Sequence, residues 1–93
     1  MIIRSQDKKT IVNFSNVTNI CCGKDNAKCI YADFACGEYE VLGEYSTEEK
    51  AIKVLDMICE EYKKYTSAKG MSTYFAFIPP KVFQMPSDEE VEV

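Results

Sequence analysis

The chain has 93 residues, a formal net charge of −4 and no histidine. A chain of this length builds one hydrophobic core, so the sequence predicts a single domain. The missing histidine excludes Ser-His and Cys-His nucleophile pairs and removes the commonest general base. Lysine and arginine form no basic face, so direct nucleic-acid binding is not expected.

The N-terminus turns polar after two apolar residues, and no apolar run approaches the roughly 18 residues that cross a bilayer. Five cysteines without an export signal are typical of a reducing compartment. The sequence therefore predicts a soluble, cytoplasmic protein without a signal peptide or membrane anchor.

The first half of the chain has the pattern of short β-strands. β-Branched and aromatic residues, separated by turn residues, predict strands at residues 2–4, 10–14, 17–22, 28–36 and 39–45. Alternation in the fourth segment places Ile30, Ala32, Phe34 and Cys36 on one face. In the fifth, Tyr39, Val41, Gly43 and Tyr45 are expected to face the core, opposite Glu40, Leu42 and Glu44. Gly43 is a candidate β-bulge.

A helix is expected from about residue 47 to about residue 68. Ser46, Thr47, Glu48 and Glu49 match a capping box in which Ser46 is the N-cap. The apolar residues that follow recur at steps of three and four, which is typical of an amphipathic helix. The predicted buried stripe is formed by Ala51, Leu55, Ile58, Tyr62 and Tyr65, widened by Ile52, Val54 and Cys59.

The last segments are shorter. Residues 74–78 are a candidate buried strand, and residues 82–85 are a candidate edge strand after Pro79 and Pro80. The expected fold is α+β, with an antiparallel sheet of four to six short strands packed against one long amphipathic helix. Residues 1–86 form the domain in this interpretation, and residues 87–93 form an acidic, flexible tail.

The residues offer little for catalysis, and the sequence predicts no enzyme, no catalytic residue and no cofactor. Cys21, Cys22, Cys29 and Cys36 are a weak alternative as zinc ligands, because four thiolates can hold zinc but the usual CxxC spacing is missing. Buried thiols are the favoured interpretation. Glu38, Glu40 and Glu44 are best explained as a solvated strand face rather than as an acid/base pair.

Six tyrosines are many for a chain of this length. Tyrosine is enriched at interfaces because it combines apolar area with a hydroxyl group. The predicted interaction residues are Tyr31, Tyr39, Glu40, Glu44 and Tyr74. A protein partner is expected, and self-association is its simplest form.

Three blocks of the sequence carry a resemblance to a known group of proteins. They are MIIRSQDKK (residues 1–9), LGEYSTEEKAIKVLDMI (residues 42–58) and VFQMP (residues 82–86). They resemble a family of short uncharacterised Firmicutes and phage-type proteins. The resemblance brings no catalytic residues, and it implies a mobile-element setting. The leading hypothesis is a non-enzymatic binding or regulatory module. The alternative is a phage-encoded inhibitor of a bacterial defence system, either an anti-CRISPR-like nuclease blocker or a protein that sequesters a nucleotide signal.

Overall fold

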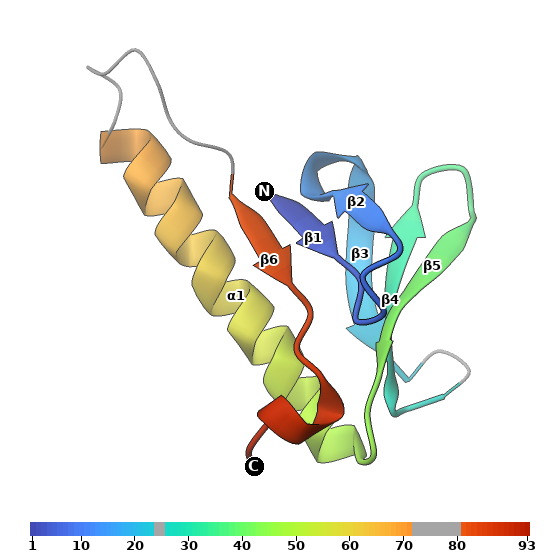
Figure 1. The fold of residues 1–93 in the computed structure, drawn as a ribbon. Coiled ribbons are helices and arrows are strands. Elements are labelled where there is room, and N and C mark those ends of the chain that lie inside the picture. Colours follow the sequence, from blue (N-terminus) through green and yellow to red (C-terminus); the bar gives the residue numbers. More distant parts are fainter. Residues whose placement is uncertain (24–25, 72–80) are drawn as a thin grey trace.

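A computed structural model describes residues 1–23, 26–71 and 81–93, with side chains for all of these except residues 65–71. This part of the chain contains six strands, one α-helix and two short 3-10 helices (Figure 1). In chain order they are β1 (Ile2–Arg4), β2 (Ile11–Asn13), η1 (Phe14–Asn16), β3 (Val17–Cys22), β4 (Cys29–Phe34), β5 (Tyr39–Glu44), α1 (Glu48–Met71), β6 (Val82–Gln84) and η3 (Asp88–Glu90). The candidate strand at residues 74–78 lies outside the described residues. No helix in the described ranges is long and apolar enough to span a bilayer.

The strands form two sheets rather than the single antiparallel sheet that was predicted. One sheet has the order β2-β1-β6, and the other has the order β3-β4-β5. All strand pairs are antiparallel except β1 and β6, which run parallel. A parallel neighbour requires a long crossover, and the chain makes it through α1 before β6 returns beside β1. The prediction of an α+β fold with several short strands and one long helix is confirmed.

The helix begins one residue later than the predicted capping box requires. The Lys50 backbone N–H donates to Thr47 Oγ1 at 3.1 Å, so Thr47 caps the helix. Ser46 was the predicted cap, but its backbone N–H donates to Asp88 Oδ1 at 2.7 Å. Asp88, 42 residues further along the chain, therefore engages the Ser46 N–H, and the sequence around Ser46 does not predict this contact.

One narrow stripe of α1 enters the core. Ala51, Val54 and Ile58 are buried, whereas Ile52 is 45% exposed and Tyr62 is 41% exposed. The predicted stripe was therefore too wide, and its centre lies at Val54 rather than Leu55. The core lies between the two sheets and the helix, and its buried members are Ile3, Val12, Ile30, Ala32, Leu42, Tyr45, Ala51, Val54, Ile58, Phe83, Met85 and Val91.

A register shift in β5 changes which of its residues face the core. Ile30 pairs with Gly43 but Tyr31 pairs with Val41, so Leu42 is an extra residue on the β5 side. This is the bulge that Gly43 predicted. Leu42 is 1% exposed and Val41 is 48% exposed. The prediction that Tyr39 and Val41 face the core, opposite Leu42, was wrong because the bulge breaks the two-residue alternation.

The turn after β1 joins the two sheets. The Gln6 backbone N–H donates to the Leu42 carbonyl at 2.7 Å. The Gln6 side chain then accepts from the Glu44 N–H at 2.9 Å and donates to the Glu44 carbonyl at 3.0 Å. Gln6 thus occupies the outer edge of β5 near Glu44 as a neighbouring strand would.

The C-terminal segment packs on the domain, in contrast to the predicted flexible tail. Val91 is only 4% exposed and belongs to the core. Lys50 Nζ donates to the Asp88 carbonyl at 3.0 Å, and the buried Tyr45 hydroxyl donates to the Pro86 carbonyl at 2.8 Å. The Ser87 N–H donates to Glu90 Oε1 at 3.0 Å, which closes η3. The acidic composition suggested solvation, but these carboxylates bond to backbone groups of the domain.

These contacts predict a loss of stability in acid. The hydrogen bond from the Ser46 backbone N–H lowers the pKa of Asp88 from 3.8, and that from Ser87 lowers the pKa of Glu90 from 4.5. A lowered folded-state pKa contributes stability above the unfolded pKa and loses it as the pH falls through the folded value. We expect the urea midpoint to decrease as the pH falls below about 4. Asp88→Asn should flatten this dependence, and an unchanged slope in that variant would contradict the assignment.

Candidate functional site

The outer face of the β3-β4-β5 sheet brings together most of the predicted interaction residues. In the antiparallel register, Cys21 and Val41 lie opposite Tyr31, Tyr39 lies opposite Asp33, and Glu44 lies opposite Cys29. Directly paired residues share a sheet face, so these seven side chains lie on one side. The other side carries Ile30 and Ala32 into the core. We call this surface the tyrosine face; its residues are Cys21, Cys29, Tyr31, Asp33, Tyr39, Val41 and Glu44.

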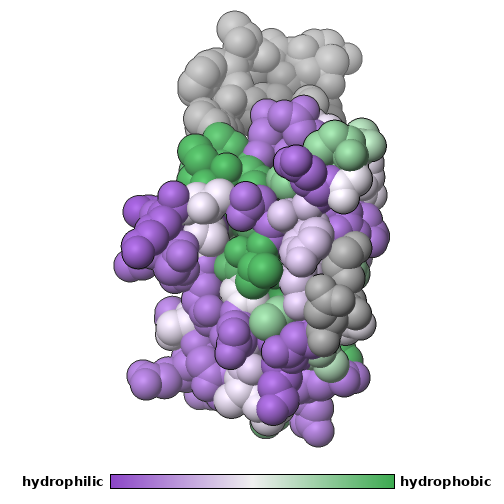
Figure 2. Space-filling model, turned by 90° about the vertical axis from the view of Figure 1, so that its right-hand side faces the viewer, coloured by the Kyte–Doolittle hydropathy of each residue, from purple (hydrophilic) through white to green (hydrophobic). Residues whose placement is uncertain are grey.

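The centre of the tyrosine face is apolar, and its exposed side chains pack on the buried Tyr31 ring. The Tyr31 and Tyr39 rings meet edge to face with centroids 5.5 Å apart. Tyr31 is 4% exposed, so the prediction of an exposed contact residue was wrong for Tyr31, which supports its neighbours instead. Tyr39 and Val41 are 46% and 48% exposed. Figure 2 looks at the side of the molecule on which β4 and β5 lie and shows apolar area bordered by hydrophilic residues.

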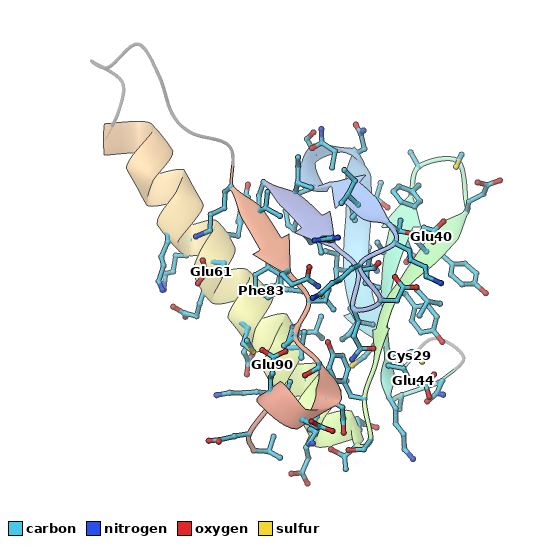
Figure 3. All side chains as sticks on the ribbon, in the orientation of Figure 1. Cys29, Glu40, Glu44, Glu61, Phe83 and Glu90 are labelled. Atoms are coloured by element: carbon cyan, nitrogen blue, oxygen red, sulfur yellow. The ribbon has the colours of Figure 1, made fainter. Side chains whose placement is uncertain are left out.

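The three glutamates near β5 do not share one face of the sheet. Glu38 precedes β5, and Glu44 ends the strand opposite Cys29 on the tyrosine face. Glu40, a predicted interaction residue, pairs with the core residue Ala32 and therefore lies on the opposite sheet face. Figure 3 shows Glu44 beside Cys29, while Glu40 lies further along β5. The three carboxylates are exposed, and none forms an ion pair with another described residue. The fifth predicted residue, Tyr74, lies outside the described residues.

The turn at residues 5–9 borders the tyrosine face. Gln6 and Asp7 line a shallow hollow of about 140 Å³ together with Val41, Leu42, Gly43 and Glu44. Asp7 Oδ1 accepts from Ser5 Oγ at 2.6 Å and from the Lys9 N–H at 2.9 Å, which fixes the turn. These bonds, led by that from Ser5, lower the pKa of Asp7. The sequence predicted a polar turn at residues 5–9 but not its position beside this face, and it placed Val41 in the core; the bulge signal at Gly43 was the only indication that Val41 could face outward.

The four cysteines considered as zinc ligands do not gather. Cys21 and Cys22 are consecutive in β3 and point to opposite faces, and Cys36 is exposed in the turn after β4. Within residues 1–23, 26–71 and 81–93, no group of three or more His, Cys, Asp or Glu could hold a metal ion. Burial, followed by the nearby Glu48 charge, raises the pKa of Cys22 and so favours its thiol form.

A second hollow lies between α1 and the start of β3. It measures about 410 Å³ and is lined by Phe14, Val17, Thr18, Asn19, Ile20, Leu55, Ile58, Cys59 and Tyr62. The Phe14 and Tyr62 rings stack with centroids 4.8 Å apart. Cys59 is exposed at this hollow, although sequence reasoning placed it in the core. The lining is mainly apolar and carries no charged side chain that would orient a ligand.

Comparison of the chain with protein-family models, with curated proteins and with solved structures finds no match. The geometry of the tyrosine face therefore carries the functional argument.

Proposed function

We propose that this protein is a non-enzymatic binding module that contacts a protein partner through the tyrosine face. The observation that carries the proposal is the pair of exposed apolar side chains, Tyr39 and Val41, held over the buried Tyr31 ring. A rigid, partly apolar surface with a polar rim is typical of protein interfaces.

The chemistry around the tyrosine face supports binding rather than catalysis. Glu40 and Glu44 are exposed and lie on opposite faces of the sheet, so they do not form the paired carboxylates of a general acid and base. The buried Cys29 thiol donates to Glu44 Oε2 at 3.9 Å, a contact between neighbouring strands of the sheet.

The second candidate function is a phage-encoded inhibitor that covers the working surface of a bacterial defence protein. If acidic side chains form the contact surface of such an inhibitor, the exposed carboxylates around β5 are better candidates than the acids of the C-terminal segment. Asp88 and Glu90 accept hydrogen bonds from Ser46 and Ser87, so they are less available to imitate phosphates. A strain that carries the targeted system should then regain phage sensitivity when it expresses this chain, whereas a regulator would leave plaque numbers unchanged.

The proposed function predicts cross-linking from the tyrosine face. Val41→p-benzoylphenylalanine places a photo-reactive group at the centre of the face. We expect it to give discrete adducts in a lysate of the organism that encodes the protein, because the side chain lies within a contact surface. Mass spectrometry identifies each adduct.

Ile52 supplies the matched control, since it is also an exposed β-branched residue, at 45%, but it lies on α1. The same probe at Ile52 should give no discrete adduct. Equal labelling from both positions, or none from Val41, would contradict the proposed function.

A further inference from the structure

β3 is an edge strand, and its outer edge has no neighbouring strand in the described part of the chain. The sheet order is β3-β4-β5, so β4 pairs with only one edge of β3 (Figure 1). The strand has the sequence VTNICC, without a charged residue or a proline. Those are the residues that usually prevent an exposed edge from pairing with another chain. The β3 edge is therefore suited to accept a further strand.

The backbone hydrogen bonds of β4 alternate between its two neighbours. The Tyr45 N–H donates to the Lys28 carbonyl at 2.9 Å, just before β4 begins. At the other end of the strand, the Phe34 N–H donates to the Glu38 carbonyl at 2.9 Å. Successive residues of a strand direct their backbone groups to opposite edges. The even-numbered residues of β4 therefore bond toward β5, and the odd-numbered residues bond toward β3.

This alternation determines which backbone groups of β3 face the open edge. Asn19 and Cys21 lie opposite odd-numbered residues of β4, so their N–H and C=O groups bond to that strand. The alternate residues, Ile20 and Cys22, direct their N–H and C=O groups away from β4. Such a row of donors and acceptors is matched by the backbone of another extended segment.

The hollow of about 410 Å³ lies along the same edge. Residues 17–20 line it on the β3 side, and Leu55 and Cys59 are among the residues that line it on α1. Ile20 is paired with the core residue Ala32, so its side chain lies on the face of the sheet that α1 covers. A residue placed opposite Ile20 by a further strand would share that face and direct its side chain into the hollow. No lining residue is charged, so an uncharged side chain fits there.

We infer that the β3 edge binds an extended segment of a partner protein, which pairs with the backbone of Ile20 and Cys22 and so extends the β3-β4-β5 sheet. Apolar side chains at positions i and i+2 of that segment enter the hollow beside Leu55 and Cys59. Backbone hydrogen bonds supply the affinity, and the hollow selects the side chains. A second copy would present another hollow at this edge, whereas an extended segment presents side chains that fill it.

This contact goes beyond the proposed function, because it uses a different surface. The tyrosine face is the outer face of the sheet, whereas the hollow lies on the side that α1 covers. One partner segment can therefore occupy the β3 edge while the tyrosine face stays open to a protein contact.

The test is selection from a library of random twelve-residue peptides on the intact protein, followed by amide hydrogen exchange measured by NMR. We expect the enriched peptides to carry apolar residues at positions i and i+2. A bound peptide should slow exchange of the Ile20 and Cys22 amides at least about tenfold, because it supplies their hydrogen-bond acceptors. The Asn19 and Cys21 amides already bond to β4, so their exchange should change by less than about twofold.

Two matched variants test the hollow. Cys59 and Cys36 are both exposed, but of the two only Cys59 lines the hollow. Cys59→Glu places a charge among apolar residues and should weaken binding of the selected peptides at least about tenfold. Cys36→Glu makes the same change in the turn after β4 and should bind them within about twofold of wild type. Circular dichroism confirms that each variant is folded.

Several outcomes would overturn the inference. These are no enrichment, enriched peptides that leave the Ile20 and Cys22 amides unchanged, or equal loss of binding in both cysteine variants. Protection of these two amides without any peptide would also overturn it. Protection that grows with protein concentration would identify a second copy as the occupant, and protection independent of concentration would identify another segment of the same chain.

The proposed function fails or stands separately. If Val41 cross-links a partner while the selection yields no peptide that protects β3, the binding module stands and the inference about the β3 edge fails. If selected peptides protect Ile20 and Cys22 while Val41 cross-links nothing, the β3 edge is the contact surface and the assignment to the tyrosine face fails.

Discussion

Val54→Asp is expected to unfold the protein, whereas Leu55→Asp one position later is expected to leave it folded. Val54 is fully buried between the sheets and the helix. A carboxylate there would be buried without a hydrogen-bond or charge partner. We expect it to lower the free energy of unfolding by more than about 4 kcal/mol, which is most of the stability of a small domain. Leu55 is only partly buried and lines the open hollow beside Phe14. An aspartate there can reach water, so the expected loss is about 1–2 kcal/mol.

Urea titration followed by far-UV circular dichroism measures both variants. A cooperative transition close to that of wild type in Val54→Asp would show that this helix face is not the core face. The reverse order, with Leu55→Asp unfolded and Val54→Asp stable, would support the wider stripe that the sequence predicted. The pair is a sharp test because the two positions are adjacent in the same helix and differ mainly in the direction of the side chain.

The elements of the fold were largely predictable because each has a local cause. β-Branched residues and turns identified the strands, and a spacing of three and four identified α1. The errors arose where contacts between distant residues decide the outcome. Asp88 takes the Ser46 N–H, so the cap moves to Thr47. The parallel placement of β6 beside β1 likewise depends on the whole chain rather than on residues 82–84.

The candidate site was predictable only in part. Tyr39 and Glu44 were chosen as interaction residues, and the structure places both on the tyrosine face. Tyr31 was chosen with them, but its ring is buried under Tyr39, because exposure depends on neighbours that alternation does not specify. Val41 was assigned to the core because strict alternation along residues 39–45 takes no account of the extra residue at Leu42.

Removing residues 87–93 is expected to destabilise the protein strongly, although the segment looks like a disposable acidic tail in the sequence. Val91 belongs to the core, and its burial alone corresponds to about 1.5–2 kcal/mol. The truncation also removes Asp88, which accepts from the Ser46 N–H and from Lys50 next to the start of α1. We therefore expect a loss of at least about 2 kcal/mol in the free energy of unfolding.

The shorter truncation of Glu92 and Val93 is the control, since both are exposed and Val93 is 73% exposed. It should leave the urea midpoint unchanged. If the segment contributes only charge, the two truncations will melt alike and both will match wild type. If only the long truncation lowers the urea midpoint and also weakens the acid dependence of stability, the loss follows from the contacts of Asp88 and Val91. The short truncation shows that removing exposed residues from the C-terminus does not by itself change the midpoint.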